Sequence, residues 1–119
     1  MRFHRMYMDG DIIIIESPEN LDHQALLDSL TLEGCGAVVS FLGITRGLDN
    51  GKEIYRLEFD AWQNKLGQVL RSLASEAIER FSVKKIAMSH RTGCVEAGEN
   101  IVSIPVSYTH LRAHETTLD

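Results

Sequence analysis

The sequence predicts a single domain of the α+β or mixed α/β class. Apolar runs typical of strands alternate with segments of helical periodicity, and some of the strands are joined by short hairpins. This combination disfavours a doubly wound parallel sheet. The expected order is β-α-β-β-α-β-β, a mixed and mostly antiparallel sheet with two helices. A chain of 119 residues is long enough to bury one substantial core.

The first part of the chain is expected to form two strands and a short helix. A strand over residues 8–16 surrounds four consecutive isoleucines, and Ser17-Pro18 is typical of a helix start. The helix follows with a partial apolar stripe of Leu21, Ala25, Leu27 and Leu30. Residues 37–42 then have the length and branched content of a strand covered on both faces.

The second part begins with a hairpin signal, Asp49-Asn50-Gly51, followed by an alternating strand over residues 54–60. Asp60 and Gln63 have the spacing of a capping box, so a long helix is expected to start there. Its apolar stripe is predicted to face the core: Trp62, Leu66, Val69, Leu70, Leu73, Ala77 and Phe81. Strands over residues 83–89 and 100–104 complete the domain.

The pattern changes beyond residue 104. Pro105 removes a backbone donor, so it is expected at a strand end, a bulge or an edge. Residues 107–119 have no apolar stripe and contain only two leucines, so they can bury little surface. The sequence therefore predicts one domain over residues 1–106 and a tail over residues 107–119 that is non-native or disordered.

Composition excludes several classes of function. Twelve basic and 17 acidic residues give a net charge of −5, which disfavours a nucleic-acid binder with a broad basic surface. The isoleucine run is too short for a membrane span or a signal segment. Cys35 and Cys94 lack the paired spacing of a zinc site or a disulfide framework, so we expect a protein of the reducing cytoplasm with no membrane partner.

An anion site is predicted where the strand over residues 37–42 ends. Gly43 and Gly47 bound a turn that contains Arg46, and a guanidinium offers a planar fork of donors suited to phosphate or carboxylate. The alternative is an exposed arginine on a hairpin loop. His90 and Arg91 form a possible secondary site at another strand end. Their alternative is structural: His90 bonds a neighbouring carbonyl and Arg91 pairs with Glu96 or Glu99.

Other chemistry is poorly supported. His110 and His114 have helical spacing, but they lack the acid between them that a zinc protease needs, so no metal site is expected. His23 is expected to be a solvated surface residue. Cys35 and Cys94 are either small buried hydrophobes or nucleophiles. The chain has no phosphate-binding loop, dinucleotide fingerprint or nucleophile elbow, and no cofactor is predicted.

Three blocks in register resemble the large, catalytic subunit of molybdopterin synthase. They are GAVVSFLGITR at residues 36–46, LEFDAW at residues 57–62, and HRTG at residues 90–93 with AGE at residues 97–99. The resemblance covers roughly residues 8–104. It implies an α/β-hammerhead fold, a homodimer, and a small ubiquitin-like sulfur-carrier subunit at each end of it, forming a heterotetramer.

The resemblance also implies an activity. The carrier's C-terminal Gly-Gly thiocarboxylate would supply sulfur to cyclic pyranopterin monophosphate, making molybdopterin for the molybdenum cofactor. Ile44, Thr45 and Arg46 correspond to the family's substrate-binding turn, with Arg46 as an electrostatic clamp.

The family continues into a Ser-x-His-Arg motif and a helix whose lysines line the pocket. Here His110 lies near the family histidine, but Leu111 follows it and the last lysines are Lys84 and Lys85. No catalytic residue is therefore identified, and the resemblance suggests a truncated chain. The alternative function is a noncatalytic small-anion-binding or interaction module.

Overall fold

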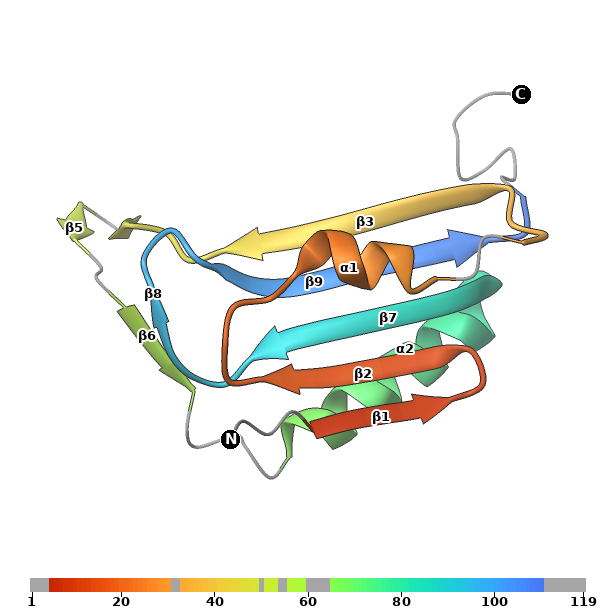
Figure 1. Cartoon of the computed structure of the whole chain (residues 1–119), viewed down its shortest axis with the longest axis horizontal. Coiled ribbons are helices and arrows are strands. Elements are labelled where there is room, and N and C mark those ends of the chain that lie inside the picture. Colours follow the sequence, from red (N-terminus) through yellow and green to blue (C-terminus); the bar gives the residue numbers. More distant parts are fainter. Residues whose placement is uncertain (1–4, 31–32, 50, 54–55, 60–64, 111–119) are drawn as a thin grey trace.

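A mixed sheet forms the centre of the molecule. The computed structural model describes residues 5–30, 33–49, 51–53, 56–59 and 65–110. Its five-stranded sheet has the order β1-β2-β7-β9-β3 (Figure 1), formed by Arg5–Asp9, Ile12–Ser17, Val83–Arg91, Asn100–Tyr108 and Ala37–Ile44. Only the β2–β7 pair is parallel; the other neighbours in this sheet are antiparallel. The predicted α+β class, with a mostly antiparallel sheet and two helices, is confirmed.

Two small ribbons lie at the end of the sheet where β3 finishes (Figure 1). One pairs β4 (Leu48–Asp49) with β5 (Lys52–Glu53), and the other pairs β6 (Arg56–Phe59) with β8 (Gly93–Glu96). The predicted hairpin after Asp49 is confirmed, and Gly51 supports it with a φ of 79°. β8 was not predicted.

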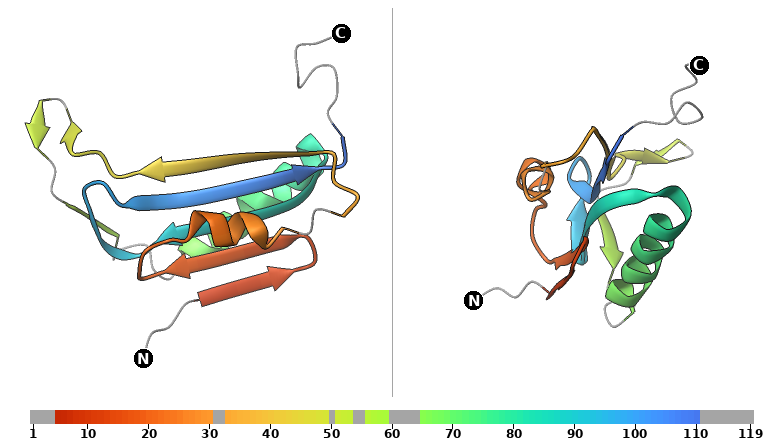
Figure 2. Two further views of the ribbon diagram at one scale, coloured as in Figure 1. Left: turned by 45° about the horizontal axis from the view of Figure 1, so that its top comes forward. Right: turned by 90° about the vertical axis from the view of Figure 1, so that its right-hand side faces the viewer.

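The helices α1 (His23–Asp28) and α2 (Leu66–Phe81) cover opposite faces of the sheet (Figure 2). α2 packs on β2 and β7, and α1 packs on β7 and β9. Ile14 therefore belongs to the core under α2, while Ile13 packs in the smaller core under α1. A strand covered on both faces needs apolar residues at successive positions, which explains the isoleucine run. Neither helix is long and apolar enough to cross a membrane in the described part of the chain.

The helix boundaries differ from the prediction. α1 begins at His23 because Asp22 caps it, its carboxylate accepting a bond from the Ala25 amide at 3.0 Å. The predicted start at Ser17-Pro18 is wrong, since Ser17 belongs to β2. The start expected at Asp60 and Gln63 lies outside the described residues.

The predicted stripe on α2 is only partly correct. Leu66 and Leu70 are buried as expected, and Ala77 packs against the core. Leu73 and Phe81 are exposed, at 50% and 57%, as is Val69 at 38%. The core-facing stripe instead continues through Ala74, which is fully buried. Trp62 lies outside the described residues.

The strand count also differs. The first predicted strand is a hairpin, β1 and β2, which turns at Gly10 with a φ of 56°. β9 does not end at residue 104 but runs through Pro105, which is fully buried opposite Ser40 in the interior of the sheet. Ser107 and Tyr108 belong to this strand, although the predicted tail starts at Ser107. The nature of the tail beyond them stays a prediction, and residues 111–119 lie outside the described part.

β3 contradicts the prediction of a strand covered on both faces. It lies at the edge of the sheet and pairs only with β9 among the described strands. Side chains on both of its faces are exposed, with Phe41 at 58% on one face and Leu42 at 37% on the other. The run has the composition of a buried strand, but no described element covers it.

Candidate functional site

The predicted anion site is a turn at the end of β3. The strand ends at Ile44, two residues beyond the predicted end at Leu42, and its register with β9 shifts between Gly43 and Ile44. Ile44 is 54% exposed and Arg46 is exposed, whereas Thr45 between them is 3% exposed. The turn therefore presents the guanidinium at the surface and turns the threonine inward.

Thr45 is fixed by the loop between β8 and β9. Its amide donates to the Glu99 carbonyl at 2.9 Å, and its carbonyl accepts from the Gly98 amide at 2.8 Å. Its buried hydroxyl makes no hydrogen bond within the described structure. Because the backbone groups of Thr45 are already bonded, this residue holds the turn in place.

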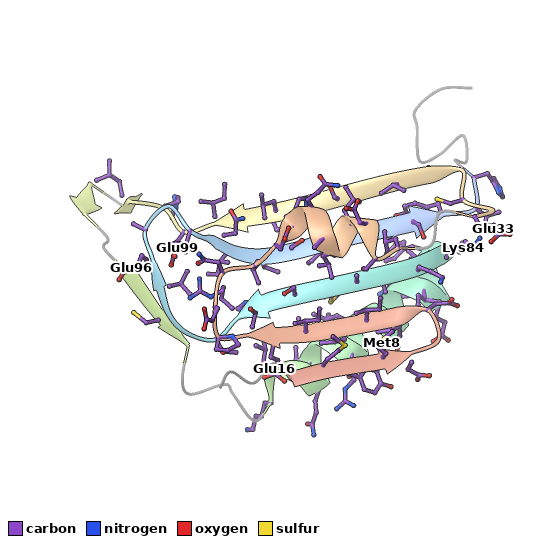
Figure 3. All side chains as sticks on the ribbon, in the orientation of Figure 1. Met8, Glu16, Glu33, Lys84, Glu96 and Glu99 are labelled. Carbon is purple, nitrogen blue, oxygen red and sulfur yellow. The ribbon has the colours of Figure 1, made fainter. Side chains whose placement is uncertain are left out.

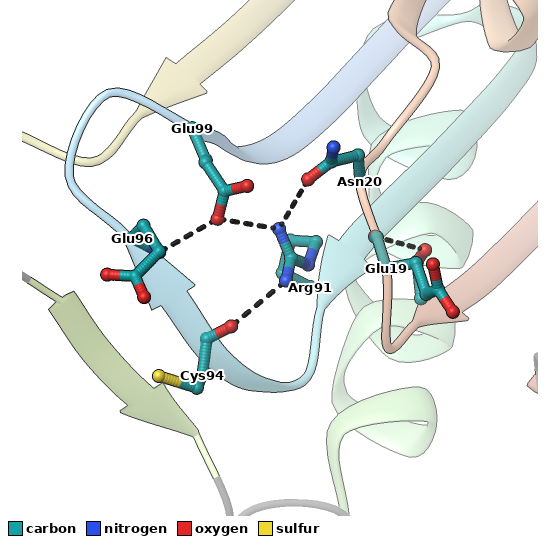
Figure 4. A network of polar contacts seen from close by, with 7 residues as sticks. Glu19, Asn20, Arg91, Cys94, Glu96 and Glu99 are labelled. Atoms are coloured by element: carbon teal, nitrogen blue, oxygen red, sulfur yellow. Dashed lines mark hydrogen bonds and ion pairs between the residues drawn. The ribbon is translucent and has the colours of Figure 1, made fainter.

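Arg91, a predicted secondary site residue, is buried. It is the last residue of β7, and its side chain is 5% exposed. One terminal nitrogen lies 3.3 Å from Asn20 Oδ1 and 3.4 Å from Glu99 Oε1, and the other donates to the Cys94 carbonyl at 3.0 Å (Figure 4). The structural alternative, pairing with Glu99, is therefore confirmed. Arg91 is not exposed to bind a ligand.

His90 also adopts its structural alternative. Its Nδ1–H donates to the carbonyl of Arg91 at 2.6 Å, and the residue is half-buried. Glu96, the other partner considered for Arg91, instead donates its amide to Glu99 Oε1 at 2.8 Å. The described hydrogen bonds of His90 and Arg91 thus order the end of β7.

Within one copy of the chain, His110 and Arg46 lie near opposite ends of β3. The amide of Gly36, just before β3, donates to the Tyr108 carbonyl at 2.8 Å, and Gly36 lies against the backbone of Thr109 and His110. Arg46 follows the other end of the strand. Eight residues of β3 separate the two ends by roughly 25 Å. Figure 3 labels one residue near each of these two ends of the sheet, Glu99 and Lys84.

Lys84 lies at the end of the sheet that carries His110. Its Nζ donates to the Glu33 carbonyl at 2.7 Å, in the connection that leads into β3. The last lysines of the sequence therefore do not take the place of pocket lysines beside Arg46.

The remaining candidates give no reactive cluster. Cys94 is exposed, contrary to the expectation of a small buried hydrophobe, and Cys35 is half-buried with its thiol donating to the Ala37 carbonyl. His23 is not a solvated residue, since its Nδ1 lies 2.5 Å from Ser103 Oγ. Within the described residues no group of three or more potential ligands could hold a metal ion.

Two hollows of the described surface lie away from the turn. A groove of about 420 Å³ lies beside α1, and a hollow of about 350 Å³ lies between β1, β2 and α2. Neither is lined by Arg46.

Comparison with known proteins identifies the family. The family described as "MoaE protein" matches residues 16–116, which is most of the chain. The chain belongs to the MoaE family. The match continues through β9 and into the segment predicted as a tail.

Relatives and solved structures agree with this MoaE assignment. The chain is 33% identical over 95 residues to the molybdopterin synthase catalytic subunit of Sclerotinia sclerotiorum, covering 80% of this chain and 48% of that protein. The chain thus spans about half the length of that relative. The crystal structure of molybdopterin synthase from Staphylococcus aureus aligns with a TM-score of 0.73 at 25% identity, over 82% of this chain and 71% of that one.

A structure of a two-subunit complex is also similar to this chain. The complex of subunits 1 and 2 of the molybdopterin-converting factor from Helicobacter pylori aligns with a TM-score of 0.63 at 25% identity. The alignment covers 82% of this chain and 66% of that chain. In that relative a protein of this fold is held in a complex with a second subunit.

Sequence reasoning missed the role of Asn20 and the bridge between Thr45 and the β8–β9 loop in this MoaE chain. The bridge consists of backbone hydrogen bonds, and these do not require particular residue types that a sequence could reveal. Asn20 lies in the connection between β2 and α1, far in sequence from Arg91. The sequence does carry one signal for this loop, since Gly98 has a φ of 90°, a conformation that favours glycine.

Proposed function

We propose that this chain acts in molybdenum cofactor biosynthesis as the catalytic subunit of a molybdopterin synthase. It would transfer sulfur from a thiocarboxylated small carrier to cyclic pyranopterin monophosphate and so make molybdopterin. One observation carries the proposal: the exposed Arg46 lies in a fixed turn at the end of β3, within the block that resembles the family's substrate-binding turn.

Arg46 would hold the phosphate of the pterin. A guanidinium forms two parallel hydrogen bonds to neighbouring phosphate oxygens, and such charge-assisted bonds are stronger than neutral ones. In a chain with a net charge of −5, a local cation is needed to attract an anionic substrate. The carrier's thiocarboxylate would approach the same turn, which lies open at the surface.

The partner would be a small ubiquitin-like protein with a C-terminal Gly-Gly thiocarboxylate. The Helicobacter pylori complex supports a second subunit for this fold. A covering subunit would also exclude water from Arg46, which strengthens electrostatic contacts with the substrate. The two free cysteines support a reducing compartment, and we propose the cytoplasm.

A second copy of the chain would cover β3. No residue of β3 is charged, so two copies can meet along this strand without like-charge repulsion. A twofold axis would pair the two β3 strands antiparallel, because an isologous interface uses the same patch on both subunits. The His110 end of one copy would then approach the Arg46 end of the other, which would bring together two residues that one chain keeps apart.

The substrate-binding role is tested by Arg46→Ala. Titration of the purified chain with cyclic pyranopterin monophosphate should show an affinity loss of about 10- to 100-fold, equivalent to about 1.5–3 kcal/mol for a hydrogen bond to a charged group. Arg80→Ala is the matched control, because Arg80 is an exposed arginine paired with Glu76 on α2. Equal affinity of the Arg46→Ala chain and the unaltered chain would rule out the clamp.

The alternative function is a noncatalytic module that binds a small anion. It is favoured by the position of Lys84, which bonds a carbonyl at the end of the sheet opposite Arg46. Thermal stabilisation by phosphorylated metabolites, with no dithiolene product when the thiocarboxylated carrier is supplied, would support this alternative. Product formation would support the synthase.

A further inference from the structure

We propose that Arg91 is a positioning residue for the anion clamp, acting on Arg46 through Glu99 and Thr45. The inference rests on the proposed function of Arg46 and adds the group that sets its orientation. Arg91 does not touch the substrate in this arrangement. It anchors the β8–β9 loop, and this loop fixes the turn that contains Arg46.

The first step is the contact set of Arg91. Its side chain joins three segments: the β2–α1 connection through Asn20, the β8–β9 loop through Glu99, and β8 through the Cys94 carbonyl (Figure 4). The acceptors lie 3.0–3.4 Å from two different nitrogens. A planar guanidinium reaches these acceptors from two nitrogens, whereas lysine carries its three donors on a single nitrogen.

The second step is from Glu99 to Thr45. Glu99 Oε1 accepts from Arg91 and also from the Glu96 amide at 2.8 Å, so its side chain is held from two directions. Its own carbonyl accepts from the Thr45 amide, and the preceding residue, Gly98, donates to the Thr45 carbonyl. Both backbone bonds of Thr45 therefore end on the loop segment that the Glu99 carboxylate anchors.

The third step is from Thr45 to Arg46. Thr45 directly precedes Arg46, so fixing its peptide groups fixes where the Arg46 side chain leaves the backbone. A clamp held in its binding orientation loses less conformational freedom when the ligand arrives. Loosening the loop should therefore weaken substrate binding without removing any contact to the substrate.

The burial of Arg91 also favours a positioning role. Taking a guanidinium out of water is costly, and buried ion pairs are often no more stabilising than apolar residues of similar volume. Here Arg91 Nε has no hydrogen-bond partner among the described residues, and Glu99 remains 32% exposed. The fold thus carries an incompletely satisfied charge next to the turn, which stability alone does not require.

The test combines Arg91→Lys with Arg46→Ala in a double-mutant cycle. In titrations with cyclic pyranopterin monophosphate, Arg91→Lys should weaken binding about tenfold with unchanged stoichiometry. This is the loss expected if the contact between Arg46 and the phosphate is partly weakened. A purely structural role would lower the binding-competent fraction and leave the affinity of the rest unchanged. In Arg46→Ala, adding Arg91→Lys should weaken binding no further.

A second readout does not depend on the substrate. Amide hydrogen exchange at Thr45 and Gly98 should accelerate at least about tenfold in Arg91→Lys, while the amides of Leu70 and Ala74 in α2 keep their protection. Glu99→Gln is the second variant, since it keeps the shape and an acceptor but removes the charge. Arg80→Lys, at an exposed ion pair on α2, should change neither readout.

Two results would overturn the inference. One is an unchanged rate of amide hydrogen exchange at Thr45 and Gly98 in both Arg91→Lys and Glu99→Gln. The other is a loss of pterin affinity by Arg91→Lys that is as large in the Arg46→Ala background as in the unaltered chain. If the unaltered chain binds no pterin, the proposed function fails, and the exchange data alone then decide whether Arg91 controls the turn.

Discussion

Two apolar strands of similar composition lie in opposite environments. β2, with its four isoleucines, is covered by α2 on one face and borders the α1 core on the other, and Ile14 is 1% exposed. β3 is as apolar, but Phe41 is 58% exposed and Val39 is 56% exposed. The contrast shows that an apolar run predicts a strand whose side chains become buried. It does not show whether the same chain or another chain buries them.

The largest expected effect is at the covered strand. Ile14→Ala should lower the free energy of unfolding by about 2–5 kcal/mol, because it leaves a cavity between the sheet and α2. Urea denaturation followed by circular dichroism measures the change. A cost below roughly 1 kcal/mol, as expected at an exposed site, would mean that the two strands differ less than the structure indicates.

The next effect concerns association through β3. Phe41→Lys should change the unfolding free energy of the monomer by no more than about 0.5 kcal/mol, because the side chain is already exposed. It should weaken the proposed dimer about 100-fold, since two lysines would meet across the twofold axis. Analytical ultracentrifugation measures the second quantity.

Leu73→Lys is the control for this experiment. Leu73 is 50% exposed on α2, away from β3, and its substitution should leave self-association unchanged. Equal weakening by both substitutions would show that β3 is not the interface. It would leave the exposed strand without its proposed partner.

The smallest effect separates two glycines that bound the anion-site turn. A Cβ at Gly43 would lie 2.7 Å from a methyl carbon of Val102, whereas nothing lies within 4 Å of one at Gly47. Gly43→Ala should therefore cost about 1–3 kcal/mol, since a β-branched neighbour has little freedom to move. Gly47→Ala should stay within about 0.5 kcal/mol. Thermal melts of the pair would reverse this interpretation if Gly47 proved the more sensitive position.

The sequence predicted the class of the fold and the place of Arg46, because both follow from local patterns. The end of β3 is marked by the glycines and the arginine, and the β4–β5 turn by Asp49 and Gly51. The β1–β2 hairpin was missed although Asp9-Gly10 is a turn signal. The isoleucine run predicts a single strand on its apolar content, and this prediction does not use the turn signal of Asp9-Gly10.

Other features depended on tertiary contacts that residue type does not encode. Pro105 is buried within the sheet, where its packing offsets the missing donor. The exposure of Leu73 follows from how α2 rotates on the sheet, which the stripe on one helix cannot fix. The site was predicted as single residues. The bridge that connects them consists of backbone bonds and a buried arginine, and these became visible only in the folded chain.

The parallel pairing of β2 with β7 has a consequence for synthesis. Ile12 pairs with Ile86, and Ala37 pairs with Tyr108, so the central hydrogen bonds join segments from opposite halves of the chain. Such nonlocal pairing must close long loops before it gains any contact, which slows folding. Because β9 lies between β7 and β3, the sheet cannot be completed until the last strand has left the ribosome. Until β7 has been made, the isoleucines of the nascent chain therefore pair with β1 on one side only.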